Sequence, residues 1–121
     1  MYYLSIDTML SAAHFLRGYD GNCSKIHGHN WKIRITVKTD QLNDIGIGLD
    51  FNEIKELSWQ IFKSYDHLCI NDVPPFDKIN PTAENLARHF YEQIDKLLPA
   101  HVKMHKISLW ETENFLVEYK A

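Results

Sequence analysis

Apolar and polar residues alternate over two stretches near the start of the chain, and this pattern predicts two β-strands. From Tyr2 to His14 the apolar residues recur at even positions, and from His27 to Lys38 they recur at odd positions. Because successive side chains of a strand point to opposite faces, each stretch predicts a strand with one buried and one solvated face. The segment 15–26 between them contains glycine, aspartate and asparagine and is predicted to be a loop.

The middle of the chain changes from this alternation to helical spacing. Asp50 opens a pattern that resembles a capping box, and apolar residues recur at helical spacing from there to about Tyr65. Residues 71–81 contain three prolines and are predicted to form a loop. Thr82 is expected to cap a second helix, which Pro99 ends.

Two further strands, Val102–Glu111 and Asn114–Tyr119, are predicted close enough together to form a hairpin. The resulting order ββααββ predicts an α+β fold with both helices on one face of an antiparallel sheet. The chain has 121 residues, the size of one ordinary domain, so we expect residues 1–121 to form a single domain. Four strands leave two sheet edges, and association with other copies would give those edges partners.

Composition and charge exclude several classes of function. A formal net charge of −3 provides no basic surface for a nucleic-acid duplex, so no nucleic-acid partner is expected. No apolar run is long enough to cross a membrane, and the N-terminal residues lack the pattern of a secretory signal. Since only Cys23 and Cys69 are available for a disulfide, we expect a reduced, cytoplasmic protein.

Three histidines predict a metal site. His27 and His29 are two residues apart in a predicted strand, so both imidazoles point to the face that the helices are expected to cover. His14 ends the other strand on its apolar parity. Three neutral imidazoles with a fourth position left open form a ligand set typical of catalytic zinc. The alternative is that these histidines are unrelated and form ordinary hydrogen bonds.

Cys23 lies four residues before His27, in the predicted loop. It is a candidate fourth metal ligand, a candidate nucleophile or base, or an inert loop thiol. A nearby cation favours the reactive thiolate form of a cysteine. A catalytic zinc ion needs an open coordination position, however, and a Cys/His₃ site would close it.

An acid–base pair and a buried carboxylate are the other candidates. Asp66 directly precedes His67, and a carboxylate fixes the tautomer of an imidazole that transfers protons. Adjacent residues of a regular helix do not face one another, so the two act together only in a turn; otherwise they form a solvated helix end. Glu111 shares the apolar parity of its strand. Its carboxylate needs a partner, such as two parallel N–H donors on a ligand edge, unless the strand bulges and Glu111 reaches water.

Taken in order, six motifs resemble one known family, and the resemblance extends over essentially the whole chain. The motifs are Ser11-Ala12-Ala13-His14, Cys23-Ser24-Lys25-Ile26-His27-Gly28-His29-Asn30, Asp50-Phe51, Asp66-His67, Pro81-Thr82-Ala83-Glu84-Asn85 and Trp110-Glu111-Thr112. The family is that of 6-pyruvoyl-tetrahydropterin synthase and 6-carboxy-tetrahydropterin synthase. The resemblance implies the tunnelling fold, in which ββααββ subunits form trimeric barrels that stack as homohexamers, with active sites at subunit interfaces.

The same resemblance implies a substrate and a role for nine residues. The substrate would be 7,8-dihydroneopterin triphosphate, and Zn²⁺ would act on the hydroxyl groups of its side chain. The zinc ligands would be His14, His27 and His29; the proton-transfer residues would be Cys23, Asp66 and His67; and the pterin contacts would be Glu111, Thr112 and Thr82.

The family divides by reaction. The pyruvoyl branch eliminates triphosphate and rearranges the side chain, whereas the carboxy branch also releases acetaldehyde and supplies the precursor of queuosine and other deazapurines. Three residues separate Cys23 from His27, which resembles the shorter loop of the carboxy branch. We therefore expect 6-carboxy-tetrahydropterin synthase activity. The alternatives are the pyruvoyl synthase and a non-catalytic zinc-binding module.

Overall fold

The computed structural model describes residues 1–121, with four β-strands and two α-helices in the order ββααββ. Short 3₁₀ turns lie in two of the connections, at Asn22–Ser24 and Ile70–Asp72. The bounds of the main elements are β1 Tyr2–His14, β2 His27–Thr39, α1 Phe51–Phe62, α2 Ala83–Leu97, β3 Lys103–Thr112 and β4 Phe115–Tyr119. The α+β order predicted from the sequence is confirmed.

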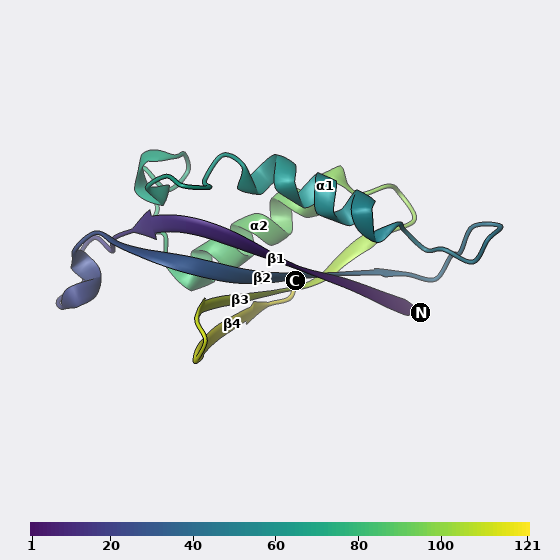
Figure 1. The fold of residues 1–121 in the computed structure, drawn as a ribbon, viewed down its shortest axis with the longest axis horizontal. Coiled ribbons are helices and arrows are strands. Elements are labelled where there is room, and N and C mark those ends of the chain that lie inside the picture. The colour runs from purple at the N-terminus through teal and green to yellow at the C-terminus, as the bar shows by residue number, and fades with distance from the viewer.

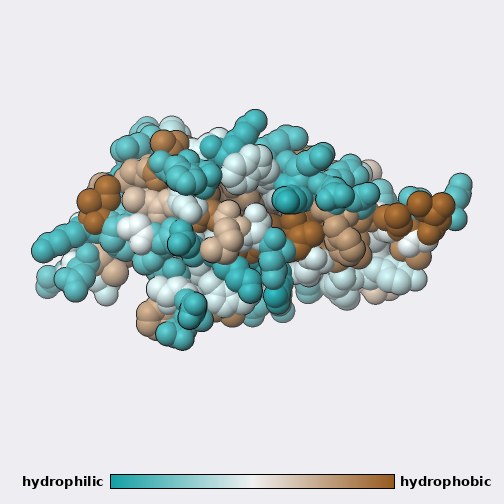
Figure 2. Space-filling model, viewed as in Figure 1, coloured by the Kyte–Doolittle hydropathy of each residue, from teal (hydrophilic) through white to brown (hydrophobic).

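The four strands form one antiparallel sheet in the order β1-β2-β3-β4, and both helices lie on the same face of it (Figure 1). The odd-numbered residues of β2 from Trp31 to Val37 are fully buried under the helices, as their alternation predicts. They belong to a single hydrophobic core of 21 buried residues. Outside this core, Figure 2 shows a mostly polar surface on which apolar residues gather in small separate patches.

Side-chain caps begin both helices. Asp50 Oδ1 accepts a hydrogen bond from Asn52 N at 2.8 Å, and Thr82 Oγ1 accepts one from Asn85 N at 3.1 Å. Glu53 lies in the first turn of α1 but returns no hydrogen bond to Asp50, so α1 begins with a simple N-cap and not with a capping box. Neither helix is long and apolar enough to cross a membrane.

The first helix is shorter than its apolar spacing predicts, because α1 ends at Phe62 and not near Tyr65. The main-chain N–H groups of Tyr65 and Asp66 both donate to the Phe62 carbonyl, at 2.9 and 3.1 Å, and this turns the chain. The turn directs the Tyr65 side chain, which is 3% exposed, into the core against the rings of Phe76 and Phe90. Tertiary packing thus ends the helix and places Asp66 in a turn.

One end of the outer edge of β1 is covered by the chain itself. The main-chain N–H of His67 donates to the Ser11 carbonyl at 2.6 Å, and Ala13 N donates to the Leu68 carbonyl at 3.0 Å. A parallel bridge between Ala13 and Cys69 extends this contact. At the other side of the sheet, no strand of the chain pairs with the outer edge of β4.

Candidate metal centre

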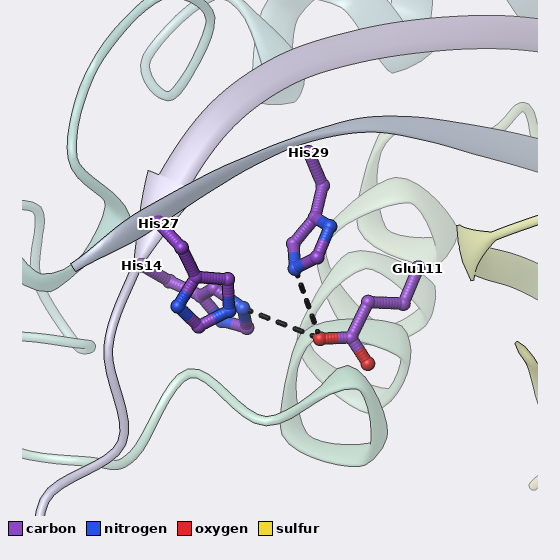
Figure 3. A group of neighbouring side chains, drawn as sticks. All are labelled: His14, His27, His29 and Glu111. Atoms are coloured by element: carbon purple, nitrogen blue, oxygen red, sulfur yellow. Dashed lines mark ion pairs between the residues drawn. The ribbon is translucent and has the colours of Figure 1, made fainter. Parts of the chain in front are cut away.

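Three imidazoles and one carboxylate converge at one end of the sheet. His14, the last residue of β1, lies opposite His27, the first residue of β2, and His29 follows on the same face. Glu111 joins them from β3 (Figure 3). Each residue offers one ligand atom, and these four atoms all lie within 4.8 Å of one another. The structure therefore brings together the three histidines whose parity predicts a common face.

A buried tryptophan supports the histidine rings. The Trp31 side chain is fully buried, and its ring centroid lies 4.9 Å from that of His14 and 5.1 Å from that of His29, both edge-on. Its indole N–H donates to the Ala12 carbonyl at 3.3 Å, which fixes the orientation of the ring. Trp31 thus closes one side of the site with an apolar wall and limits how far the imidazoles can rotate.

Main-chain carbonyls fix the tautomer of two of the rings. His14 Nδ1 lies 2.8 Å from the Pro81 carbonyl, and His27 Nδ1 lies 2.7 Å from the Lys25 carbonyl. A carbonyl only accepts hydrogen bonds, so each neutral ring carries its proton on Nδ1 and leaves the Nε2 lone pair free. A second ring nitrogen held in this way is the usual arrangement for a metal-binding histidine.

Two buried nitrogen atoms in this group have no hydrogen-bond partner, namely His14 Nε2 and His29 Nε2. Glu111 Oε1 lies 3.3 and 3.2 Å from them, but neither approach has the direction of a hydrogen bond. Buried polar atoms are rarely left unpaired. The donor set and its unsatisfied atoms therefore fit a metal ion.

The protonation of these rings also suits metal binding. Burial is the main influence on the pKa of both His14 and His29, and it lowers both values below that of an exposed imidazole. The Pro81 carbonyl, for His14, and the Glu111 carboxylate, for both rings, partly oppose the effect, while the other histidines add to it. The two rings are consequently neutral near pH 7, and neutral imidazole is the form that binds a metal.

Glu111 reaches the histidines because β3 bulges there. The pairing of β3 with β4 shifts register between Trp110 and Thr112, so Glu111 has no partner on β4 and its side chain is 27% exposed. One carboxylate oxygen points to the rings of His14 and His29, and the other points away from them (Figure 3). The bulge, one of the alternatives predicted from the sequence, is therefore present. The Glu111 carboxylate makes no hydrogen bond to His14 or His29, and a ligand contact of Glu111 stays a prediction.

Asp66 and His67 form a pair in the turn after α1 and not a solvated helix end. His67 Nδ1 lies 2.9 Å from Asp66 Oδ2, and Ser11 N donates to Asp66 Oδ1 at 3.2 Å. Burial raises the pKa of Asp66, but these two hydrogen bonds and the charge of His67 outweigh it, so the pKa lies below its usual value. His67 has φ = 60°, a left-handed conformation that is uncommon outside glycine and is found more often at functional sites.

Two cavities meet at His29. One, of about 550 Å³, is also lined by His67 and Cys69, and the other, of about 680 Å³, is also lined by Glu111 and Thr112. Both have the size of a small-molecule site. A ligand bound next to His29 would therefore be within reach of the acid–base pair on one side and of the β3 bulge on the other.

Cys23 and Thr82 lie outside this group. Cys23 is in the 3₁₀ turn between β1 and β2, its carbonyl accepts a hydrogen bond from Leu16 N at 2.7 Å, and its thiol is not among the four converging donors. Thr82 lines neither of the two cavities, and its hydroxyl caps α2. Their predicted roles in proton transfer and pterin binding stay predictions.

Sequence reasoning missed the groups that support the ligands. The carbonyls of Pro81 and Lys25 give no signal in a sequence, because every residue has a carbonyl and only the fold decides where it points. Trp31 has a signal, since it shares the parity of His27 and His29 and therefore their face of β2. The position of Glu111 beside these histidines had the same kind of signal in its apolar parity.

Known proteins resemble the chain in sequence and in fold. A family model described as 6-pyruvoyl tetrahydropterin synthase matches residues 3–121. A 6-carboxy-5,6,7,8-tetrahydropterin synthase of Bacillus subtilis is 36% identical over 100 residues, which cover 78% of this chain and 66% of that protein, just under two thirds of its length. A 6-pyruvoyl tetrahydrobiopterin synthase of Pongo abelii is 34% identical over 105 residues, which cover 84% of this chain and 72% of that protein.

The structural comparison agrees with the sequence matches. The solved structure of Caenorhabditis elegans 6-pyruvoyl tetrahydropterin synthase has a TM-score of 0.89 to this chain, with 23% sequence identity, and the match covers 99% of this chain and 95% of that one. The two proteins thus share the fold of four antiparallel strands and two helices. Since the family match covers residues 3–121 and so includes the histidine cluster, the chain belongs to the 6-pyruvoyl tetrahydropterin synthase family.

Proposed function

We propose that this protein is a zinc-dependent enzyme that converts 7,8-dihydroneopterin triphosphate and one water molecule to 6-carboxy-5,6,7,8-tetrahydropterin, with release of acetaldehyde and triphosphate. The observation that carries the proposal is the group of His14, His27, His29 and Glu111, whose buried ring nitrogens lack other partners. The relative from Bacillus subtilis, named for this reaction, and the short Cys23-to-His27 spacing support the carboxy branch. The reaction would supply the precursor of queuosine and other deazapurines.

The three histidines are proposed to hold the ion, which leaves a position open for the substrate. A zinc ion held there would make the hydroxyl groups of the pterin side chain more acidic. Glu111 would then bind the amino-pyrimidine edge of the pterin through two parallel hydrogen bonds, since its carboxylate lies on the wall of the 680 Å³ cavity. Thr112, on the same wall, and Thr82 are proposed as further pterin contacts.

Proton transfer is proposed for His67, Asp66 and Cys23. The Asp66 carboxylate holds His67 through Nδ1, so Nε2 of the exposed ring is free to accept or donate a proton. Cys23 is proposed as the base, in the loop that leads to His27. A closed structural zinc site needs neither an acid–base pair nor substrate-sized cavities, which counts against a non-catalytic zinc module.

The assembly is proposed to be a homohexamer formed by two trimeric rings. The outer edge of β4 and most of the outer edge of β1 have no partner within the chain. Unpaired edges of this kind favour pairing with another chain. The cavities on either side of His29 would then be completed by residues of neighbouring copies.

The pyruvoyl reaction is the second candidate, because the relative from Pongo abelii carries that name at similar identity. The product decides between the two. Purified zinc-loaded protein incubated with 7,8-dihydroneopterin triphosphate is expected to form acetaldehyde and 6-carboxy-tetrahydropterin in equal amounts. A coupled acetaldehyde assay, run beside chromatography of the pterins, measures both. Formation of 6-pyruvoyl-tetrahydropterin without acetaldehyde would contradict the carboxy assignment and leave the metal site intact.

A further inference from the structure

Asn80 makes a two-way hydrogen-bonded pair with the main chain just beyond the metal-binding end of β1. Its Oδ1 accepts from Arg17 N at 2.8 Å, and its Nδ2 donates to the Arg17 carbonyl at 2.8 Å. The carboxamide thus bonds both the N–H and the carbonyl of Arg17, as a neighbouring strand would, although Arg17 lies beyond the end of the sheet. Asn80 thus joins residues 15–17, which follow His14, to the loop before α2.

This junction lies next to the carbonyl that orients His14. The next residue after Asn80 is the buried Pro81, whose carbonyl lies 2.8 Å from His14 Nδ1. The carbonyl of Asn80 itself accepts a hydrogen bond from Asn85 Nδ2 at 2.9 Å, and Thr82 is fixed as the cap of α2. Proline has a fixed φ and no N–H, so the direction of its carbonyl depends on how its two neighbours are held.

A second asparagine holds the same segment independently. Asn71 Oδ1 accepts from Phe15 N at 2.9 Å, and Asn71 Nδ2 donates to the Phe15 carbonyl at 3.0 Å. We therefore expect the segment after β1 to stay attached to the core through Asn71 when the Asn80 side chain is removed. What should change is the position of the Pro81 carbonyl relative to His14.

From these contacts we infer that Asn80 is a positioning residue for the metal site: it holds the Pro81 carbonyl at the distance that fixes the tautomer and ring orientation of His14. The inference rests on the metal ligands proposed above and does not depend on which pterin reaction follows. Replacement of groups that orient a metal-binding histidine typically weakens metal affinity by about 10–100-fold. Asn80 acts through one intervening residue, so the lower end of this range is expected.

The test is the Zn²⁺ affinity of metal-depleted protein, measured without substrate by competition with a chelator. Asn80→Ala is expected to weaken zinc binding by about tenfold. Asn80→Asp keeps the acceptor for Arg17 N but loses the donor, so it is expected to weaken zinc binding by a smaller factor. If the alanine variant folds poorly, this variant provides the same test. The absorption bands of bound Co²⁺ are expected to shift in both variants, because the orientation of one ligand changes.

Thr39→Val is the matched control, since the Thr39 side chain, like that of Asn80, hydrogen-bonds the main chain of a distant segment. Its hydroxyl donates to the His101 carbonyl at 2.8 Å, and it pairs with Tyr2 at the opposite end of the β1–β2 ladder from His14. The control is expected to have a lower melting temperature but wild-type zinc affinity and an unchanged Co²⁺ spectrum. Zinc affinity of Asn80→Ala within twofold of wild type would overturn the inference, and so would equal weakening in Thr39→Val. Failure of the pterin assay alone would leave these metal measurements unaffected.

Discussion

Replacement of His29 with alanine is expected to remove the bound metal and abolish activity. His29 supplies one of three imidazoles in the group, and its Nε2 is buried with no other partner. Mutation of a group that hydrogen-bonds to a metal ligand weakens metal affinity by up to about 100-fold. Removal of a ligand itself should weaken zinc binding by more than that. Zinc content of the purified variant, measured by mass spectrometry of the metal, is expected to fall from about one ion per chain to a trace.

The matched control for this variant is His105→Ala. His105 is a partly exposed histidine on β3 that packs against the ring of Tyr3, at the other end of the sheet from His14 and His29. It is expected to keep both the metal and the activity. Full zinc content in His29→Ala, or an equal loss in His105→Ala, would contradict the assignment of the metal ligands.

Replacement of His67 with asparagine is expected to lower kcat by about 10²–10⁴-fold while zinc content stays at the wild-type level. The proposed proton transfer uses the imidazole ring of His67, and an amide cannot replace an imidazole as an acid or a base. Asparagine is chosen because it tolerates the φ of 60° at this position better than alanine does. Steady-state kinetics with 7,8-dihydroneopterin triphosphate measure the effect.

The exposure of His67 makes this variant easy to interpret. Its side chain is 79% exposed, so truncation removes little packing, and the melting temperature should change little. Asp66→Asn is expected to show a smaller loss of kcat, because the ring remains but its tautomer is no longer fixed. A wild-type kcat in His67→Asn would refute the acid–base role and leave the metal site standing.

Periodicity alone predicted most of the fold. The alternation in β1 and β2 placed His14, His27 and His29 on the helix-covered face, because parity in a strand translates directly into a side of the sheet. Helix starts were also predictable from Asp50 and Thr82, whose side chains cap the helices they precede. These features depend on neighbours within a few residues, which a single sequence displays.

The features that the sequence did not predict depend on distant contacts. The end of α1 depends on the fit of Tyr65 against Phe76 and Phe90, which are far along the chain. The bulge at Glu111, which the sequence indicated only as an alternative, depends on how β3 pairs with β4. The support of His14 by Pro81 depends on a main-chain carbonyl 67 residues away. No local pattern of residue types encodes such contacts.

X-ray absorption spectroscopy of the zinc-loaded wild-type protein shows whether three histidines hold the metal while Cys23 stays outside its coordination sphere. We expect only nitrogen and oxygen neighbours, at about 2.0–2.2 Å, with the outer-shell scattering of imidazole rings. We expect no sulfur neighbour at about 2.3 Å. A sulfur atom at that distance would place a cysteine on the metal, would close the site against a substrate, and would contradict the proposed catalytic centre.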